Sequence, residues 1–290
     1  MYEILRKEKL AENIYLMDIH APRVAASAHP GQFIILRSTP EGEHIPLTIS
    51  DYDIERGTVQ IVVQTLGVST LKLAEKEQGE SVEDFAGPLG RPSEFIYENL
   101  EELKGKKLLF IAGGVGTAPV YPQVKWLKEH GVDADVIIGA KTKDLLILTD
   151  EMRAVAGNLY IATDDGSEGF HGMVTGCLKK LVEEDGKKYD TVITIGPMIM
   201  MKFVALTTKE LGIPTIASLN SLMVDGTGMC GACRVSVGGK TKFTCVDGPE
   251  FDAHEVDFDE AMRRSGQYRD EEQRRLEKYK DHKCRIGLDK

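Results

Sequence analysis

Residues 108–119 read LLFIAGGVGTAP, an unbroken apolar run that leads directly into a glycine-rich turn. An apolar run of this length is typical of a strand that is buried on both faces of a parallel sheet. Residues 121–130, which follow the turn, have the pattern of a helix. The stretch is therefore predicted to form a strand, a tight turn and a helix.

The same alternation repeats from this point to residue 218. Strand–helix alternation indicates a doubly wound α/β domain with a parallel sheet. Further strands are expected at residues 136–138, 159–162, 191–195 and 215–218, and further helices at 144–156, 174–184 and 198–211. The strand at 215–218 is expected to close the sheet.

The first hundred residues have a different character, with short β-rich segments between turn signals. These segments lie at residues 14–19, 32–36, 46–50 and 58–63. Short strands at this spacing predict a small antiparallel β-barrel, and a charged link follows it at 101–107. We expect three parts: the barrel at 1–102, the α/β domain at 103–220, and a small module with a charged tail at 221–290.

Three turns at the carboxyl ends of expected strands form a candidate nucleotide site, because doubly wound sheets bind ligands at that edge. Glycines let the backbone approach a pyrophosphate, and the next helix offers free N–H groups at its N-terminus. The pattern G-G-x-G-T is shorter than G-x-G-x-x-G, so a tight structural turn is the alternative. The candidate residues are Gly113, Gly114, Gly116, Thr117, Asp164, Asp165, Gly166, Gly196, Pro197 and Met198.

The acidic pair Asp164 and Asp165 bears on which nucleotide this site prefers. Carboxylates accept hydrogen bonds from ribose hydroxyls and repel a 2′-phosphate. The pair therefore favours NAD(H) over NADP(H), with an ordinary Asx turn as the alternative.

Near the C-terminus, residues 224–234 read VDGTGMCGACR, and Cys245 follows. The spacing D-x4-C-x2-C-x11-C becomes that of a plant-type [2Fe–2S] ferredoxin if Cys replaces the aspartate. The candidate ligands are Asp225, Cys230, Cys233 and Cys245, and the glycines between them permit close wrapping of a cluster. Zinc is the alternative, although structural zinc sites usually have two C-x2-C pairs.

Composition narrows the class of protein. A formal charge of −10 over 290 residues argues against nucleic acid and against a basic membrane-docking face. The most apolar stretch, 191–206, is too short and too interrupted to span a bilayer, and the N-terminus has no apolar core of a secretory signal. Three clustered cysteines out of five fit a reducing cytoplasm.

The charged last thirty residues predict a solvated helical tail, or alternatively a partner-docking arm.

The order of barrel, A-G-G-x-G-T turn and G-P-M turn resembles the ferredoxin–NADP reductase superfamily. The cysteine loop narrows the resemblance to the branch with the dihydroorotate dehydrogenase electron-transfer subunits. The run 218–234, together with DGPEF at 247–251, is similar to the small subunits of NADH-dependent reduced ferredoxin:NADP oxidoreductases, also called sulfide dehydrogenase small subunits.

This resemblance implies an electron-transfer subunit of an electron-bifurcating transhydrogenase complex, with FAD, a [2Fe–2S] cluster and NAD(H) as cofactors. It implies two partners, ferredoxin and a larger subunit with flavin and [4Fe–4S] clusters that handles NADP(H). No acid–base triad is needed, because the cofactors carry the chemistry. The implied FAD-binding residues are Pro46, Leu47, Thr48, Ile49, Gly67, Ser69 and Thr70.

Two departures from the family pattern stand out. Asp225 occupies the place of the first of four cysteines in the dihydroorotate-linked subunits, which favours the transhydrogenase group. Ile45, beside His44, replaces an arginine that the superfamily has before the flavin-contacting aromatic. The alternatives are an electron-transfer subunit of dihydroorotate dehydrogenase and a non-enzymatic redox or zinc-bound regulatory module.

Overall fold

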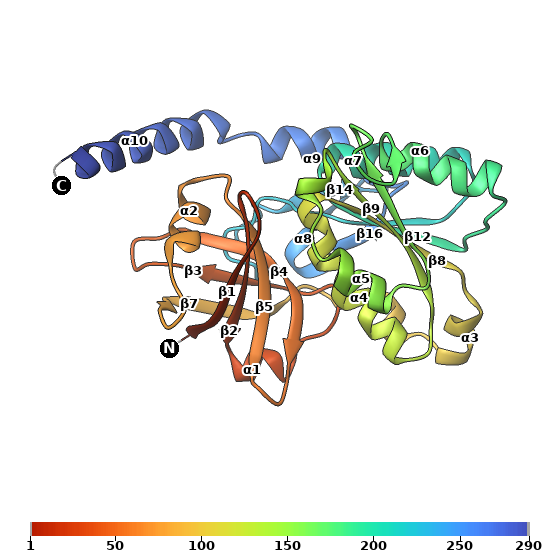
Figure 1. The fold of residues 1–290 in the computed structure, drawn as a ribbon, viewed down its shortest axis with the longest axis horizontal. Helices are drawn as coiled ribbons and strands as arrows, with labels where there is room; N and C mark the ends of the chain where they lie inside the picture. Colours follow the sequence, from red (N-terminus) through yellow and green to blue (C-terminus); the bar gives the residue numbers. More distant parts are fainter. Residues whose placement is uncertain (1, 289–290) are drawn as a thin grey trace.

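The computed structural model describes residues 2–288, with side chains through residue 281, and contains two large sheets that lie side by side (Figure 1). The first sheet is a nearly closed antiparallel barrel with the strand order β6-β1-β2-β5-β4-β3-β7. Its strands are β1 (Tyr2–Ala11), β2 (Ile14–His20), β3 (Phe33–Arg37), β4 (His44–Asp53), β5 (Thr58–Gln64), β6 (Ser81–Val82) and β7 (Asp84–Leu89).

Apolar side chains that alternate along the strands fill the barrel. Met17 of β2 lies opposite Ile61 of β5, and both are fully buried. Strand β1 was not expected, because half of its sequence, YEILRKEKLA, is charged; its buried side chains are Ile4 and Ala11. Two short helices, α1 (Pro22–Ala25) and α2 (Val68–Glu75), complete this part.

The second sheet has the order β11-β10-β9-β8-β12-β13-β16, and the strands from β11 to β13 are parallel. The order reverses direction between β8 and β12, which marks the usual ligand crevice of such folds. Its strands are β8 (Leu108–Gly113), β9 (Ala134–Ala140), β10 (Leu159–Thr163), β11 (Phe170–His171), β12 (Thr191–Ile195), β13 (Thr215–Ser218) and β16 (Glu250–Asp252).

Helices cover both faces of this sheet, as a doubly wound fold requires. One face is packed by α4 (Thr117–Glu129) and α5 (Thr149–Val155), and α3 (Leu100–Gly105) lies at the edge of the same core. The other face is packed by α6 (Val174–Lys179) and α7 (Met198–Glu210). The fold class expected from the sequence, a barrel followed by a doubly wound α/β domain and a small C-terminal module, is confirmed.

The C-terminal segment contains a hairpin of β14 (Arg234–Val237) and β15 (Lys240–Phe243), then α8 (Thr244–Asp247), β16, α9 (Phe258–Ser265) and α10 (Arg269–Leu288). Strand β16 pairs antiparallel with β13, so the prediction that residues 215–218 close the sheet is wrong. Helix α10 runs back over the barrel towards α2 (Figure 1). The tail is helical, as expected.

One expected helix is shorter than predicted, and another changes its hydrogen-bonding pattern part-way. Within residues 144–156, only Thr149–Val155 is α-helical, because Leu148 adopts a left-handed backbone (φ 53°) that interrupts the helix before it. The helix expected at 174–184 is α-helical in its first part, α6, and continues as a π-helix over Lys180–Glu184. The residue boundaries expected between the barrel, the α/β domain and the C-terminal module stay predictions.

Across residues 2–288, no helix is both long enough and apolar enough to cross a membrane.

Candidate functional site

The hairpin of β14 and β15 explains the spacing of the last two cysteines. Cys233 directly precedes β14 and Cys245 follows β15, so the antiparallel pairing returns the chain to its starting point. Gly238 and Gly239 make the reversal, both with positive φ. The two Sγ atoms lie 3.2 Å apart, and both residues are about 1% exposed.

This sulfur pair suits a metal centre. Two thiolates on one tetrahedral metal at about 2.3 Å would lie about 3.8 Å apart, so the two sulfur atoms need to separate by only about 0.6 Å to bind one metal. Burial, followed by the neighbouring Cys233, raises the pKa of Cys245 to about 12. A bound metal cation would reverse this preference, because it deprotonates a coordinating thiol. The two thiols are therefore expected to lose their protons only when a metal ion binds them.

The first half of the loop has a different arrangement. Asp225 accepts hydrogen bonds from the backbone N–H of Thr227 (2.8 Å) and of Cys230 (3.1 Å). The bond from Thr227 does most to lower the pKa of Asp225, so the side chain is a carboxylate at neutral pH. The Cys230 side chain is exposed. Among the side chains that the structure describes, residues 2–281, no three of His, Cys, Asp or Glu converge as a finished metal site.

The cysteine loop packs against the barrel. Gly226 has φ +73°, and a Cβ there would come within 2.7 Å of Ile35 in β3 and 2.8 Å of Leu89 in β7. Nδ1 of His44, the first residue of β4, lies 3.2 Å from the Val224 carbonyl. The candidate iron ligands and the start of the expected flavin strand are therefore in contact.

The expected flavin residues occupy two segments that the barrel brings together. On β4, Pro46, Leu47 and Thr48 are half-buried opposite β3, whereas Ile49 points into the core at 1% exposure. Ile45, in the place of the missing arginine, is also buried.

The second expected flavin segment, which contains Gly67, Ser69 and Thr70, forms the start of helix α2. A hydrogen bond joins it to Glu43, which directly precedes β4. Thr70 Oγ1 accepts from the Gly67 amide (3.1 Å) and donates to the Gly67 carbonyl (3.0 Å). Ser69 Oγ donates to the carboxylate of Glu43 at 2.7 Å, and Arg275 of α10 pairs with the same carboxylate. The Ser69 hydroxyl, followed by Arg275, lowers the pKa of Glu43. The tail thus reaches the expected flavin site.

The first and third nucleotide turns meet at the point where the strand order reverses. A Cβ on Gly116 would lie 2.2 Å from the Ile195 carbonyl, and one on Gly196 would lie 3.0 Å from the Gly113 nitrogen. These glycines are required by the packing of one turn on the other. By contrast, Gly114 has φ +54° and open space before it, as close approach of a ligand requires.

The flanking residues of these turns begin two helices. Thr117 starts α4, and its Oγ1 donates to the Gly114 carbonyl at 2.9 Å. Pro197 is the N-cap of α7, and the buried Met198 is its first residue. Both helix N-termini therefore point to the same crevice.

The second nucleotide turn follows β10, and its two aspartates differ. Asp165 accepts from the Ser167 amide (3.0 Å) and hydroxyl (2.6 Å), which lowers the pKa of Asp165. Asp165 therefore forms an Asx turn, which was the alternative interpretation of the acidic pair. Asp164 is exposed at the strand end, and Gly166 has φ +73°. Of the pair, only Asp165 is engaged in this turn.

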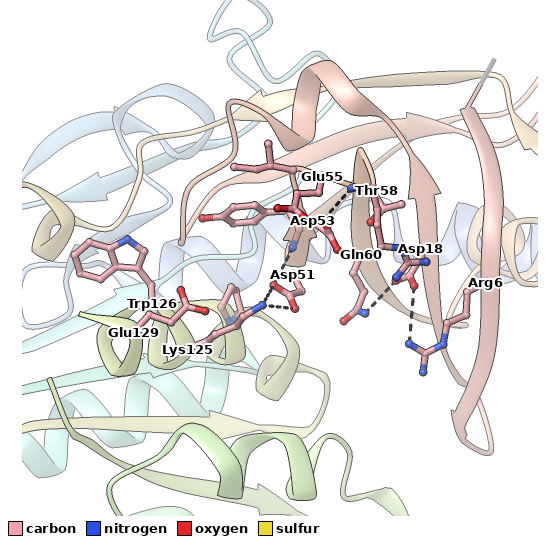
Figure 2. A pocket seen from close by; sticks show the side chains of 14 residues that line it. Arg6, Asp18, Asp51, Asp53, Glu55, Thr58, Gln60, Lys125, Trp126 and Glu129 are labelled. Carbon is pink, nitrogen blue, oxygen red and sulfur yellow. Dashed lines mark hydrogen bonds and ion pairs between the residues drawn. The ribbon is translucent and has the colours of Figure 1, made fainter. Parts of the chain in front are cut away.

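A cavity of about 590 Å³ lies between the barrel and helix α4, away from all of these residues (Figure 2). One ion pair of its lining crosses the joint between the sheets, and another polar contact lies within the barrel. Lys125 Nζ donates to both oxygens of Asp51 (2.8 and 2.9 Å), and Gln60 Nε2 donates to the buried Asp18 at 3.0 Å. The cavity is a polar joint between the two parts.

Sequence reasoning missed two polar groups that hold the modules together. Glu250 of β16 accepts from Ser93 Oγ, in the link between the sheets, at 2.8 Å. Arg264 of α9 donates to two carbonyls of the cysteine loop. Glu250 lies in the DGPEF run at 247–251 and Arg264 in no motif, but in both cases only tertiary structure reveals the partner.

Comparison with known proteins agrees with this architecture. The iron–sulfur cluster binding domain of dihydroorotate dehydrogenase B matches residues 220–257. A Thermotoga maritima homolog of the dihydroorotate dehydrogenase B (NAD(+)) electron transfer subunit is 46% identical over 96% of this chain and 95% of its own. The chain belongs to the dihydroorotate dehydrogenase B electron transfer subunit family. The expected resemblance is confirmed.

Two further relatives are similar to the chain over nearly its whole length. An uncharacterized protein from the adh 3′ region of Clostridium beijerinckii is 62% identical over 94% of this chain and 92% of its own. A solved structure of NADH-dependent reduced ferredoxin-NADP oxidoreductase, studied for flavin-based electron bifurcation, superposes with a TM-score of 0.87. It is 44% identical and covers 96% of this chain and 98% of its own. The chain is thus an oxidoreductase electron-transfer subunit.

Proposed function

We propose that this protein is the FAD- and [2Fe–2S]-containing subunit that exchanges electrons with NAD(H) in a ferredoxin- and NADP-linked, electron-bifurcating transhydrogenase complex. The observation that carries this proposal is the contact between the cysteine loop and the barrel. Gly226 meets β3 and β7, and Val224 meets His44 at the start of β4. A flavin on β4 and a cluster in the loop would be neighbours, as electron transfer between them requires.

The residues of the chain suit these groups. The first turn of α2, which follows Gly67, offers the backbone N–H groups of Ser69 and Thr70 to a diphosphate, and half-buried Pro46, Leu47 and Thr48 offer a surface for a flavin ring. When bound, FAD exchanges two electrons with nicotinamide and single electrons with an iron–sulfur cluster. The protein orients these groups and excludes water, and the cofactors carry the proton and electron chemistry.

The nucleotide is proposed to be NAD(H). It would lie in the crevice of Gly113, Gly114 and Gly116 and of Gly196, Pro197 and Met198, with Asp164 facing the ribose. Asp164→Asn should narrow the preference for NADH over NADPH in steady-state dye reduction, whereas Asp165→Asn should mainly loosen its turn. A wild-type preference for NADPH would refute the role of these aspartates.

We propose that Asp225, Cys230, Cys233 and Cys245 hold the cluster, with Asp225 as the fourth ligand. Its carboxylate hydrogen-bonds the Cys230 amide, which places it beside the exposed thiol. In the alternative, Asp225 only caps the loop, and a water or Ser221 completes the iron. Ser221 Oγ already shares a 2.9 Å hydrogen bond with Thr244 Oγ1.

Two variants separate these possibilities for Asp225. A carboxylate is a harder donor than a thiolate, so Asp225→Cys should keep the cluster and shift its potential and EPR signal. Asp225→Ala should make the cluster labile. An unchanged EPR signal and potential in both variants would remove Asp225 from the coordination sphere.

The electrons need a second chain, because the described residues contain no further cofactor loop of this kind. The cysteine loop, with its exposed Cys230, and the residue after Cys245 carry exposed apolar side chains, as a docking surface would require: Met229 (88%), Val224 (50%) and Val246 (38%). We propose a larger subunit with flavin and [4Fe–4S] clusters that handles NADP(H), and ferredoxin as the other redox partner. The clustered thiols favour the cytoplasm as its location.

Purification of the native complex tests this assignment. The isolated chain should reduce dyes with NADH but should not reduce NADP with ferredoxin. The complex should do both, and its larger subunit should bind NADP(H). Oxidation of dihydroorotate by the complex would instead assign the chain to dihydroorotate dehydrogenase.

A further inference from the structure

The guanidinium of Arg264 is hydrogen-bonded to the backbone of the cysteine loop. Its Nη2 donates to the Ala232 carbonyl at 3.1 Å, and its Nε donates to the Arg234 carbonyl at 3.2 Å. These two carbonyls flank Cys233, the buried member of the C-x2-C pair. The Cys233 carbonyl itself accepts from Thr244 Oγ1 at 2.9 Å. Three consecutive carbonyls are therefore fixed by donors.

These bonds also set the direction of the amide groups in the loop. In a trans peptide the C=O and the following N–H point in opposite directions. Arg264 binds the Ala232 carbonyl, so the N–H of Cys233 points away from the guanidinium. Amide groups oriented in this way are what a cluster's negative sulfur atoms require.

Helix α9, which carries Arg264, is anchored at several points. Its Phe258 and Ala261 are buried in a core that it shares with β14 and α7. The Asp257 side chain caps the helix by accepting from the Glu260 amide at 2.8 Å. Lys202 of α7 forms a 2.7 Å ion pair with Asp259. Helix α9 is therefore held in place, and it positions Arg264 next to the cysteine loop.

We propose that Arg264 is a positioning residue of the iron–sulfur site, which fixes the Cys230–Cys233 segment and supplies a positive charge that favours the reduced cluster. The inference rests on the proposed function, because it requires that the loop holds a cluster. Reduction adds one negative charge to a group that is already anionic, and a fixed cation beside the loop stabilises the added charge. A second guanidinium, that of Arg234, lies 3.5 Å from the Gly231 carbonyl and adds to the same field.

Replacing Arg264 separates its charge from its geometry. Arg264→Gln removes the charge and one of the two donors, so the midpoint potential of the cluster should become more negative in an EPR-monitored titration of the full chain. Iron release to a chelator should become about tenfold faster, because hydrogen bonds from a charged group are lost. Arg264→Lys keeps the charge but not the two-pronged geometry, so it should restore the potential and leave iron release fast.

Arg263→Gln is the matched control. Arg263 lies on the same turn of α9 with an exposed side chain, so its loss should change neither quantity. Wild-type potential and iron release in Arg264→Gln would overturn the proposal. Equal shifts in Arg263→Gln would overturn it as well, because they would reflect net charge alone. If Arg264→Gln does not fold, the potential and iron release of Arg264→Lys decide. A wild-type chain without a cluster would instead refute the proposed function.

Discussion

Replacement of Glu250 by Gln is expected to stabilise the protein at pH 8 and to have little effect at pH 4. Glu250 lies on β16, where the last segment meets the link between the two sheets, and its carboxyl group accepts from Ser93 Oγ at 2.8 Å. Burial raises the pKa of Glu250 to about 7, and the charge of Glu94 adds to this, although the bond from Ser93 opposes it. Near neutral pH the group is therefore partly protonated.

The size and sign of the effect follow from this pKa. A change from the ordinary value of 4.5 to about 7 corresponds to about 3 kcal/mol in favour of the neutral form. Below pH 4.5 the carboxyl group is neutral in both the folded and the unfolded protein, so it does not lower the free energy of unfolding. As the pH rises through 7, the folded protein must hold a carboxylate, and up to about 3 kcal/mol of unfolding free energy is lost. Glutamine cannot ionise, so the variant keeps this stability.

Urea unfolding at pH 4 and pH 8 measures the difference. Trp126, the single tryptophan, stacks on His130 at 3.8 Å between ring centroids and reports on α4. Glu102→Gln on the exposed surface of α3 is the control, and it should behave as the wild type at both values. An equal gain for the Glu250 variant at the two pH values would refute the reasoning, because the gain would then not come from ionisation.

Two other substitutions test the packing between the parts. Gly116→Ala should cost about 2 kcal/mol in urea unfolding and weaken NADH binding, because its Cβ would lie 2.2 Å from the Ile195 carbonyl. Gly105→Ala, at the end of α3 with nothing within 4 Å, should be neutral; equal losses in both would contradict the expected clash. Lys125→Ala breaks the half-buried pair with Asp51 and should cost about 1 kcal/mol, less at high salt; a salt-independent loss would point to packing instead.

The fold was accessible from sequence where local pattern and tertiary role agree. The apolar run 108–112 predicted β8, because strands buried on both faces are apolar throughout, and the alternation of strands and helices predicted β12. Strand β1 escaped notice because its outward side chains are charged. Strand β16 is three residues long, so it has too little pattern of its own to be recognised and depends on β13 for its pairing.

The candidate site was predictable as a set of residues but not as an arrangement. The spacing of Cys233 and Cys245 anticipates the hairpin that brings their sulfur atoms together. The spacing of Asp225 says nothing of the two amides that its carboxylate accepts from. The partner of Arg264 is about thirty residues away, and long-range contacts of this kind leave no periodic signal in the sequence.

The pairing of β16 with β13 also affects how the chain folds during synthesis. The residues of β16 leave the ribosome about thirty positions after those of β13, which is a delay of a few seconds at roughly 5–20 residues per second. During that interval the β13 edge of the nascent sheet is unpaired, and an open edge can bind a neighbouring chain. The sheet is completed only after all the cysteines of the loop have been translated. A chain that stops short of β16 would therefore be left with an aggregation-prone edge, which marks it for removal by the cell's quality control.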